Sequence, residues 1–172
     1  MDFLDLVSEV IDLRSFSNLW YWIVLAVLWS GLSQWTLGVP YHIVARARRG
    51  DVEAHRDMVA LARINGERIL TQTENSAPLA LGLATFIATA LAVTGWIYGA
   101  EFAQALFLLL FPALIVGGLT VMTARRLRED GYTDVARRLR LHRLYVQMLG
   151  VVFIFITAFW GMYMNIAVGP LG

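Results

Sequence analysis

The stretch LALGLATFIATALAVTGWIYGAEFAQALFLLLFPALIVGGLTVM, residues 79–122, decides the fold. It carries one charged side chain, Glu101, which follows Gly99 and Ala100. A helix needs about 20 apolar residues to cross ~30 Å of hydrocarbon. The stretch therefore predicts two membrane-spanning helices, over residues 79–98 and 102–122, joined by a tight turn.

Two further uncharged segments, at about residues 19–39 and 145–168, have the same character. The whole chain of 172 residues is 58% hydrophobic and 16% charged, with a mean hydropathy of +0.61. This composition is too apolar for an ordinary soluble domain. We predict an all-α integral membrane protein, a four-helix bundle that forms a single transmembrane domain over residues 1–172.

The arginines indicate the orientation of these spans. All of them except Arg14 lie in residues 45–78, between spans one and two, or in residues 124–144, between spans three and four. Basic residues concentrate in cytoplasmic loops. We therefore expect both segments in the cytoplasm and both termini outside. The 14 basic residues include no lysine, which is typical of a GC-rich bacterial genome, so the expected location is a bacterial cytoplasmic membrane with periplasmic termini.

Residues 1–16 precede the first span and alternate acidic and apolar side chains with a helical period. This pattern predicts an amphipathic helix at the outer interface. Its acidic face disfavours attraction to anionic lipid. We favour packing across the outer end of the bundle, with docking on a partner as the alternative.

Several kinds of chemistry are excluded by composition. A chain without lysine has no Schiff-base or Walker-type site, and a chain without cysteine has no thiolate nucleophile and no disulfide. No carboxylate lies inside a predicted span, which weakens a proton-coupled transporter. The histidines, His42, His55 and His142, lie outside the span interiors, so we interpret them as solvated or facing the lipid headgroups and expect no metal site.

Both cytoplasmic segments have apolar residues at helical spacing, and the second breaks at Gly131. We expect helices with one buried face. Near the membrane boundary, Glu67 and Glu74 can pair with their own neighbours, Arg68 and Asn75, or with arginines of the second segment. Residues 76–78, Ser-Ala-Pro, would suit the start of a new helix, since proline is favoured in the first turn.

Polar and small side chains inside the spans allow two further interpretations. Hydroxyls and amides in span one could line a pore if the chain assembled as an oligomer; they are Ser30, Ser33, Gln34 and Thr36. In span two, Ala84, Ala88 and Ala92 recur at intervals of four and would let another helix approach closely.

Residues 74–81, ENSAPLAL, resemble the start of the second transmembrane helix in the MAPEG family, the membrane-associated eicosanoid and glutathione proteins. There, an Arg-x-x-x-Asn-x-x-Glu pattern precedes a proline and an apolar helix. Residues 124–145, ARRLREDGYTDVARRLRLHRLY, are similar to the family's Arg-rich segment with a Gly-Tyr pair.

The resemblance implies a homotrimer that binds glutathione between subunits on the cytoplasmic side. Its implied ligands are Arg68, Glu74 and Arg125, with Tyr132 nearby. Asn75 adjoins Glu74 and belongs to the same candidate site. The chain departs from the pattern at Thr71, which stands where the family has asparagine.

Three hypotheses for function follow. The first is a non-catalytic accessory, assembly or scaffold subunit of a larger membrane complex, favoured by the missing catalytic machinery. The alternatives are a MAPEG-like glutathione-dependent transferase and a small oligomeric channel or carrier, so the question of enzymatic activity stays open. Expected partners are the lipid bilayer and either further copies of the chain or other membrane subunits, and no nucleic acid.

Overall fold

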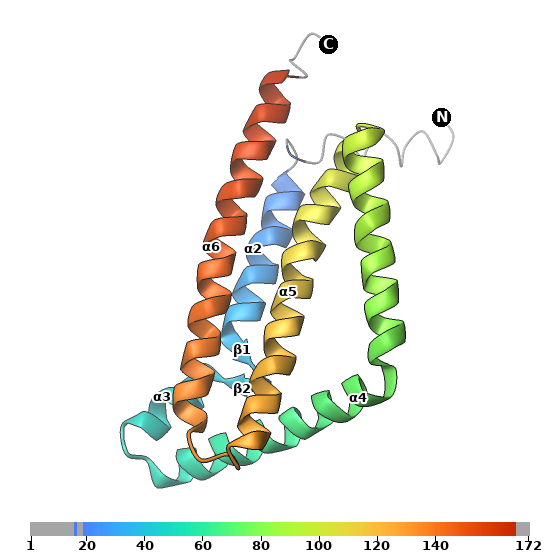
Figure 1. The fold of residues 1–172 in the computed structure, drawn as a ribbon. Helices are drawn as coiled ribbons and strands as arrows, with labels where there is room; N and C mark the ends of the chain where they lie inside the picture. The colour runs from blue at the N-terminus through green and yellow to red at the C-terminus, as the bar shows by residue number, and fades with distance from the viewer. Residues whose placement is uncertain (1–15, 17–18, 168–172) are drawn as a thin grey trace, which may run out of the picture.

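The computed structural model describes residue 16 and residues 19–167, and it is built almost entirely of helices (Figure 1). The predicted amphipathic helix over residues 1–16 lies outside the described residues, apart from Phe16. In chain order the elements are α2 (Leu19–Gln34), β1 (Trp35–Thr36), β2 (Val39–Pro40), α3 (Tyr41–Arg48), α4 (Val52–Ala92), the π-helix η2 (Val93–Ile97), α5 (Glu101–Glu129) and α6 (Val135–Ala167).

Helices α2, α5 and α6 run side by side, and α4 has two arms (Figure 1). The lower arm passes beneath the ends of α5 and α6. The upper arm rises beside α5 and meets it again at the turn after η2. Helix α2 begins, and α6 ends, at the same end of the molecule as that turn.

Three helical segments are long and apolar enough to cross a membrane: Val52–Ile97, Glu101–Glu129 and Val135–Ile166. They cover the predicted span 102–122 completely, and the spans predicted at residues 79–98 and 145–168 as far as Ile97 and Ile166. The fourth apolar helix, α2, has only 16 residues, which rise about 24 Å at 1.5 Å per residue. The described part of the chain is therefore an all-α protein with three apolar helices of spanning length.

The first span, predicted over residues 19–39, is shorter in the structure. Helix α2 ends at Gln34, and the residues that follow form a β-hairpin. Thr36 pairs with Val39, and both residues of the connecting loop have positive φ, 54° at Leu37 and 70° at Gly38. Positive φ at both loop positions defines the type I′ turn that suits the twist of paired strands. Leu37 and Val39 are buried, so their apolar character serves the core.

The hairpin also separates the polar groups assigned to span one. Ser33 donates to the carbonyl of Ser30 at 3.0 Å, and the Gln34 amide lies 3.4 Å from the Ser30 hydroxyl. Thr36 is buried in β1, outside the helix. The four groups therefore do not form one stripe along a single helix.

The prediction of a new helix starting at residues 76–78 was wrong. Helix α4 continues through Pro78. The Ser76 hydroxyl donates to the Gln72 carbonyl at 2.7 Å, and Thr73 donates to Ile69 at 2.8 Å. Proline removes one backbone hydrogen bond, and back-bonding hydroxyls bend helices. These features explain the sharp change of direction between the arms of α4 (Figure 1).

The lower arm of α4 buries every fourth residue: Ala54, Met58, Ala62, Gly66 and Leu70. This spacing confirms the predicted helix with one buried face. The buried residues pack with the hairpin, with α3 and with the ends of α5 and α6. The cluster contains Leu37, Val39, Val44, Met58, Ala62, Leu70, Ala124, Leu127, Val135 and Leu139.

The start of α4 is fixed by Asp51, the last residue of the sequence RRGD. One carboxylate oxygen accepts the backbone N–H of Ala54 at 3.0 Å, and the other accepts both Nε and Nη2 of Arg46, at 3.0 and 2.7 Å. The bond from Ala54 and the bonds from Arg46 lower the pKa of the Asp51 carboxyl below its ordinary value of 3.8. Asp51 therefore caps α4 and ties it to α3.

Replacing Asp51 with alanine should fray the first turn of α4, since the lost cap leaves a backbone N–H without its acceptor. Amide hydrogen exchange of residues 52–58 should quicken by roughly two- to thirty-fold, the range that loss of an N-cap spans. Asp51→Asn keeps a capping oxygen and should change exchange much less. Equal exchange in Asp51→Ala and the native chain would disprove the capping role.

The native cap should also respond to acid. Because the folded-state pKa of Asp51 is depressed, its stabilisation is fully present above about pH 4 and is lost as the pH falls through the lowered pKa. The Asp51→Asn chain should lack this local loss on acidification.

Candidate functional site

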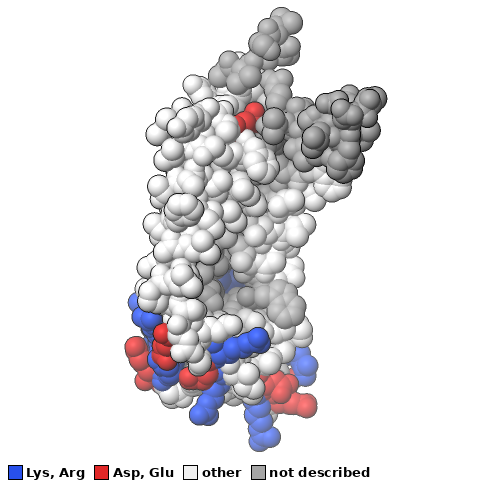
Figure 2. Space-filling model, turned by 90° about the vertical axis from the view of Figure 1, so that its right-hand side faces the viewer, with Lys and Arg blue, Asp and Glu red and all other residues white. Residues whose placement is uncertain are grey.

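Most of the charged side chains in this view gather at one end of the molecule, below a wide surface that shows few charges (Figure 2). At this end the guanidinium of Arg128, in the last turn of α5, lies between two carboxylates of α4. Its Nη2 is 3.0 Å from Oε1 of Glu74, and its Nη1 is 3.8 Å from Oε2 of Glu67. Residues seven apart share one face of a helix, so both carboxylates point towards α5. The expected pairing of Glu67 and Glu74 with the second segment is confirmed.

Tyr132 joins this group from the turn between α5 and α6. Its hydroxyl donates to Oε1 of Glu67 at 2.9 Å, and its ring lies 6.0 Å from the guanidinium carbon of Arg63. Burial of the ring, and then the bond to Glu67, raise the pKa of Tyr132 to about 12. The hydroxyl therefore stays protonated near neutral pH and acts as a hydrogen-bond donor.

The local sequence explains the position of Tyr132. Gly131 has φ 60°, its N–H donates to the Arg128 carbonyl at 3.1 Å, and the Tyr132 N–H donates to the Leu127 carbonyl at 2.9 Å. This pair of bonds is the Schellman motif, which ends a helix with glycine in the left-handed conformation. The break predicted at Gly131 is thus confirmed, and it turns Tyr132 back towards α4.

Gly66 lies opposite the tyrosine. A Cβ atom on Gly66 would lie 3.4 Å from the Tyr132 hydroxyl and 3.6 Å from Leu37. We define the charge cluster as Glu67, Glu74, Arg128 and Tyr132.

The structure brings two of the five predicted site residues into the charge cluster, Glu74 and Tyr132. Arg68, Asn75 and Arg125 are exposed, and no hydrogen bond or ion pair among the described residues joins them to it. Arg128 takes the position that the family resemblance gave to Arg125. The seven-residue spacing of Glu67 and Glu74 indicated that both could pair with one partner. The sequence does not say which partner, because three arginines follow Ala124 closely and only the rotation of α5 decides which of them faces α4.

The ion pairs of the charge cluster are open to solvent. The ion-pair side chains are about half exposed, 44% for Arg128 and 57% for Glu74, and such pairs contribute only ~0–1 kcal/mol. Within the described residues, no group of three or more His, Asp or Glu side chains could hold a metal ion. Each carboxylate of the cluster is already matched by a donor of the chain itself.

The histidines differ in environment. His42 and His55 are exposed, as predicted, whereas His142 is only 4% exposed. Its Nδ1 lies 3.0 Å from the hydroxyl of Thr123, and that hydroxyl donates to the carbonyl of Leu119 at 2.8 Å. The threonine oxygen can therefore accept a hydrogen bond from an N–H group at Nδ1. The interpretation of His142 as a solvated residue was wrong, because it packs between α5 and α6.

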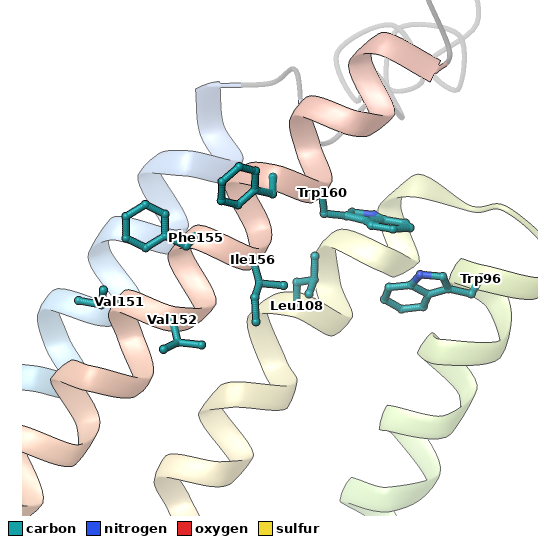
Figure 3. Close-up of a pocket in the computed structure, with 8 residues that line it drawn as sticks. Trp96, Leu108, Val151, Val152, Phe155, Ile156 and Trp160 are labelled. Atoms are coloured by element: carbon teal, nitrogen blue, oxygen red, sulfur yellow. The ribbon is translucent and has the colours of Figure 1, made fainter.

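A second kind of feature lies among the apolar helices. A hollow of about 620 Å³ lies between Trp96 of η2, Leu108 of α5 and a strip of α6. Figure 3 shows the side chains that line it. The α6 strip consists of Val151, Val152, Phe155, Ile156, Phe159 and Trp160. The Trp160 indole N–H donates to Oε1 of Gln104 at 2.9 Å, so its polar atom is already engaged. The lining is apolar.

A further groove of about 300 Å³ lies between the upper arm of α4 and α5. Ala80, Ala84 and Ala88 line one side, and Phe107 and Phe111 line the other. Of the predicted small-residue face of span two, Ala84 and Ala88 therefore look across an open groove towards α5, whereas Ala92 is not among the residues that line it. The ring of Trp96 packs against Phe107, with centroids 5.3 Å apart, and against Trp160, at 5.7 Å. This aromatic contact separates the two apolar spaces.

The geometry of the charge cluster predicts unequal effects of mutation. Tyr132→Phe removes a hydrogen bond to a charged, partly buried acceptor and should lower the free energy of unfolding by about 1.5 kcal/mol. Arg128→Gln removes half-exposed ion pairs and should cost less than ~1 kcal/mol. Denaturation of the detergent-solubilised protein can compare them, with Arg125→Gln as the control. A larger loss in Arg128→Gln than in Tyr132→Phe would contradict this assignment.

Comparison of the chain with protein-family models, with curated proteins and with solved structures finds no match.

Proposed function

We propose that the chain is a non-catalytic accessory subunit that docks on the apolar transmembrane helices of a partner in a larger membrane complex. The observation that carries this proposal is the exposure of the apolar upper arm of α4. In the most apolar 18-residue stretch of Val52–Ile97 no residue is buried, whereas 22% of the residues are buried in the corresponding stretches of α5 and α6. The upper arm therefore contributes a helix of spanning length that the described residues leave uncovered.

The groove beside this arm suits a helix. Association of helices in lipid depends on close packing, and small residues allow it. Ala80, Ala84 and Ala88 supply such a surface, and an unfilled groove forgoes the dispersion contacts that a well-packed interior makes.

The polar groups support a structural role. The carboxylates of the charge cluster are paired with Arg128 and Tyr132, which leaves the cluster without a free base. In this proposal the charged end faces the cytoplasm of a bacterium, the four apolar helices form the transmembrane bundle, and both termini lie in the periplasm. The arginine distribution supports that orientation.

The docking groove can be tested with a matched set of alanine substitutions. Ala84→Phe and Ala88→Phe fill the groove and should reduce the amount of co-purifying partner roughly ten-fold or more, as overpacking of a tight contact does. Ala90→Phe makes the same change on a residue outside the groove lining and should retain the partner. Mass spectrometry of the natively extracted assembly reads out partner identity and stoichiometry together.

Thermal unfolding of the isolated chain controls for folding, because the groove has room for a ring and Ala84→Phe should leave the melting temperature unchanged or raised. A native chain that extracts alone as a stable, closed oligomer would contradict the proposal. Equal partner loss in Ala90→Phe would also contradict it.

A second candidate is a MAPEG-like glutathione-binding protein, in which a homotrimer binds the ligand between its subunits. It is favoured by one observation: Glu74 and Tyr132, both implied by the resemblance, contribute to the same charge cluster. Here Arg128 stands in for Arg125 as the arginine of the site. A ligand with carboxylate and ammonium groups would have to displace the existing pairs.

Glutathione distinguishes the two candidates. At ten times its dissociation constant it should raise the melting temperature of a binding protein by roughly 3–5 °C. Glu74→Ala and Arg128→Ala should abolish the shift, and Glu53→Ala, which removes an exposed carboxylate at the start of α4, should preserve it. The absence of a shift at millimolar glutathione would exclude this candidate.

A further inference from the structure

A small pocket opens between α5 and α6, at the level where both helices change from apolar to basic. Helix α5 contributes Leu119, Met122, Thr123 and Arg126, and α6 contributes Arg138, Leu141, His142 and Tyr145. The apolar segment of α5 at residues 102–122 ends here, and that of α6 begins at residue 145. Both boundaries fall at the pocket, so in a membrane it would lie at the depth of the phospholipid headgroups.

The charges around this pocket are unequally matched. Arg138 is hydrogen-bonded and ion-paired to Asp130, and Arg137 lies 3.7 Å from Asp134. Among the described residues, no carboxylate forms an ion pair with Arg126, which is exposed at the pocket. The basic side chain that remains available is therefore Arg126.

The surrounding segment adds to this positive potential. Residues 124–144 contain seven arginines and three carboxylates, Glu129, Asp130 and Asp134. Basic pockets between transmembrane helices on the cytoplasmic side suit anionic lipid headgroups, and basic residues near the surface attract the anionic leaflet.

The other lining groups divide into polar and apolar sides. The Tyr145 side chain is half exposed at the pocket and carries a hydroxyl that can donate to a phosphate oxygen, while Met122 and Leu119 continue the apolar face above Arg126. His142 and Thr123 form the buried floor and are hydrogen-bonded to each other. The pocket volume of about 90 Å³ accepts a small group such as a phosphate. The acyl chains would lie outside it, along exposed residues such as Met148, which is 58% exposed.

We propose that this pocket, which we call the α5/α6 headgroup site, binds the phosphate of one anionic phospholipid. Arg126 forms charge-assisted hydrogen bonds with the phosphate oxygens, Tyr145 donates a further bond, and the acyl chains follow the apolar surface of α5 and α6. An arginine guanidinium presents several N–H donors in a plane that matches phosphate oxygens. The site is separate from the charge cluster and from the groove beside α4.

The test uses the full chain in detergent, with phosphatidylglycerol and phosphatidylcholine of identical acyl chains as probes. Native mass spectrometry should show preferential retention of phosphatidylglycerol. Arg126→Gln should weaken its binding roughly five-fold, the effect of one basic residue at a lipid surface. Arg125→Gln removes the same charge from the neighbouring residue, which does not line the pocket, and should retain the preference.

Tyr145→Phe should weaken phosphatidylglycerol binding by less than Arg126→Gln. Size-exclusion chromatography checks that each variant remains folded. Equal retention of the two lipids by the native chain would overturn the proposal, as would equal losses in Arg125→Gln and Arg126→Gln. If millimolar inorganic phosphate abolished the retention of phosphatidylglycerol, the occupant would be a soluble anion and the lipid assignment would be overturned.

Discussion

The arrangement of the molecule depends on the apolar contact between the lower arm of α4 and the ends of α3, α5 and α6. Met58, Leu70, Leu127 and Leu139 are almost completely buried there, and full burial of such a side chain from water contributes about 1.5–3 kcal/mol. The ion pairs beside them are half exposed and contribute at most ~1 kcal/mol each. Apolar burial therefore determines where the arm lies, and the charged groups pair in the positions that this packing gives them.

The same apolar contact determines where the residues of the charge cluster lie. Burial of every fourth residue from Ala54 to Leu70 fixes the rotation of the arm, and Glu67 and Glu74 then face α5. On the other side of the contact, the side chain of Leu127 is buried in the apolar core, and its carbonyl accepts the hydrogen bond from Tyr132 that ends α5. One leucine therefore links the apolar core to the turn that places Tyr132 against Glu67.

The sequence was most informative where one physical rule dominates. Uncharged segments of spanning length identified α5, α6 and the upper arm of α4, and Gly131 identified the break between α5 and α6. The hairpin at residues 35–40 was missed because Leu37 and Val39 are as apolar as a membrane span. Pro78 was misread because its bend and a new helix start share one local sequence. Arg128 and Arg125 differ only in register, which tertiary packing decides.

In the proposed membrane setting the two arms of α4 meet different solvents, and this explains why one is covered and the other is not. The charged end contacts water, where the hydrophobic effect drives Met58 and Leu70 into a core. Among lipid tails that driving force is absent, and helices associate through shape and small residues. An uncovered upper arm is therefore stable in a membrane as a single helix, since its backbone is satisfied internally. Its alanines retain the capacity for close packing, and any partner of matching shape would gain contacts without displacing a polar group.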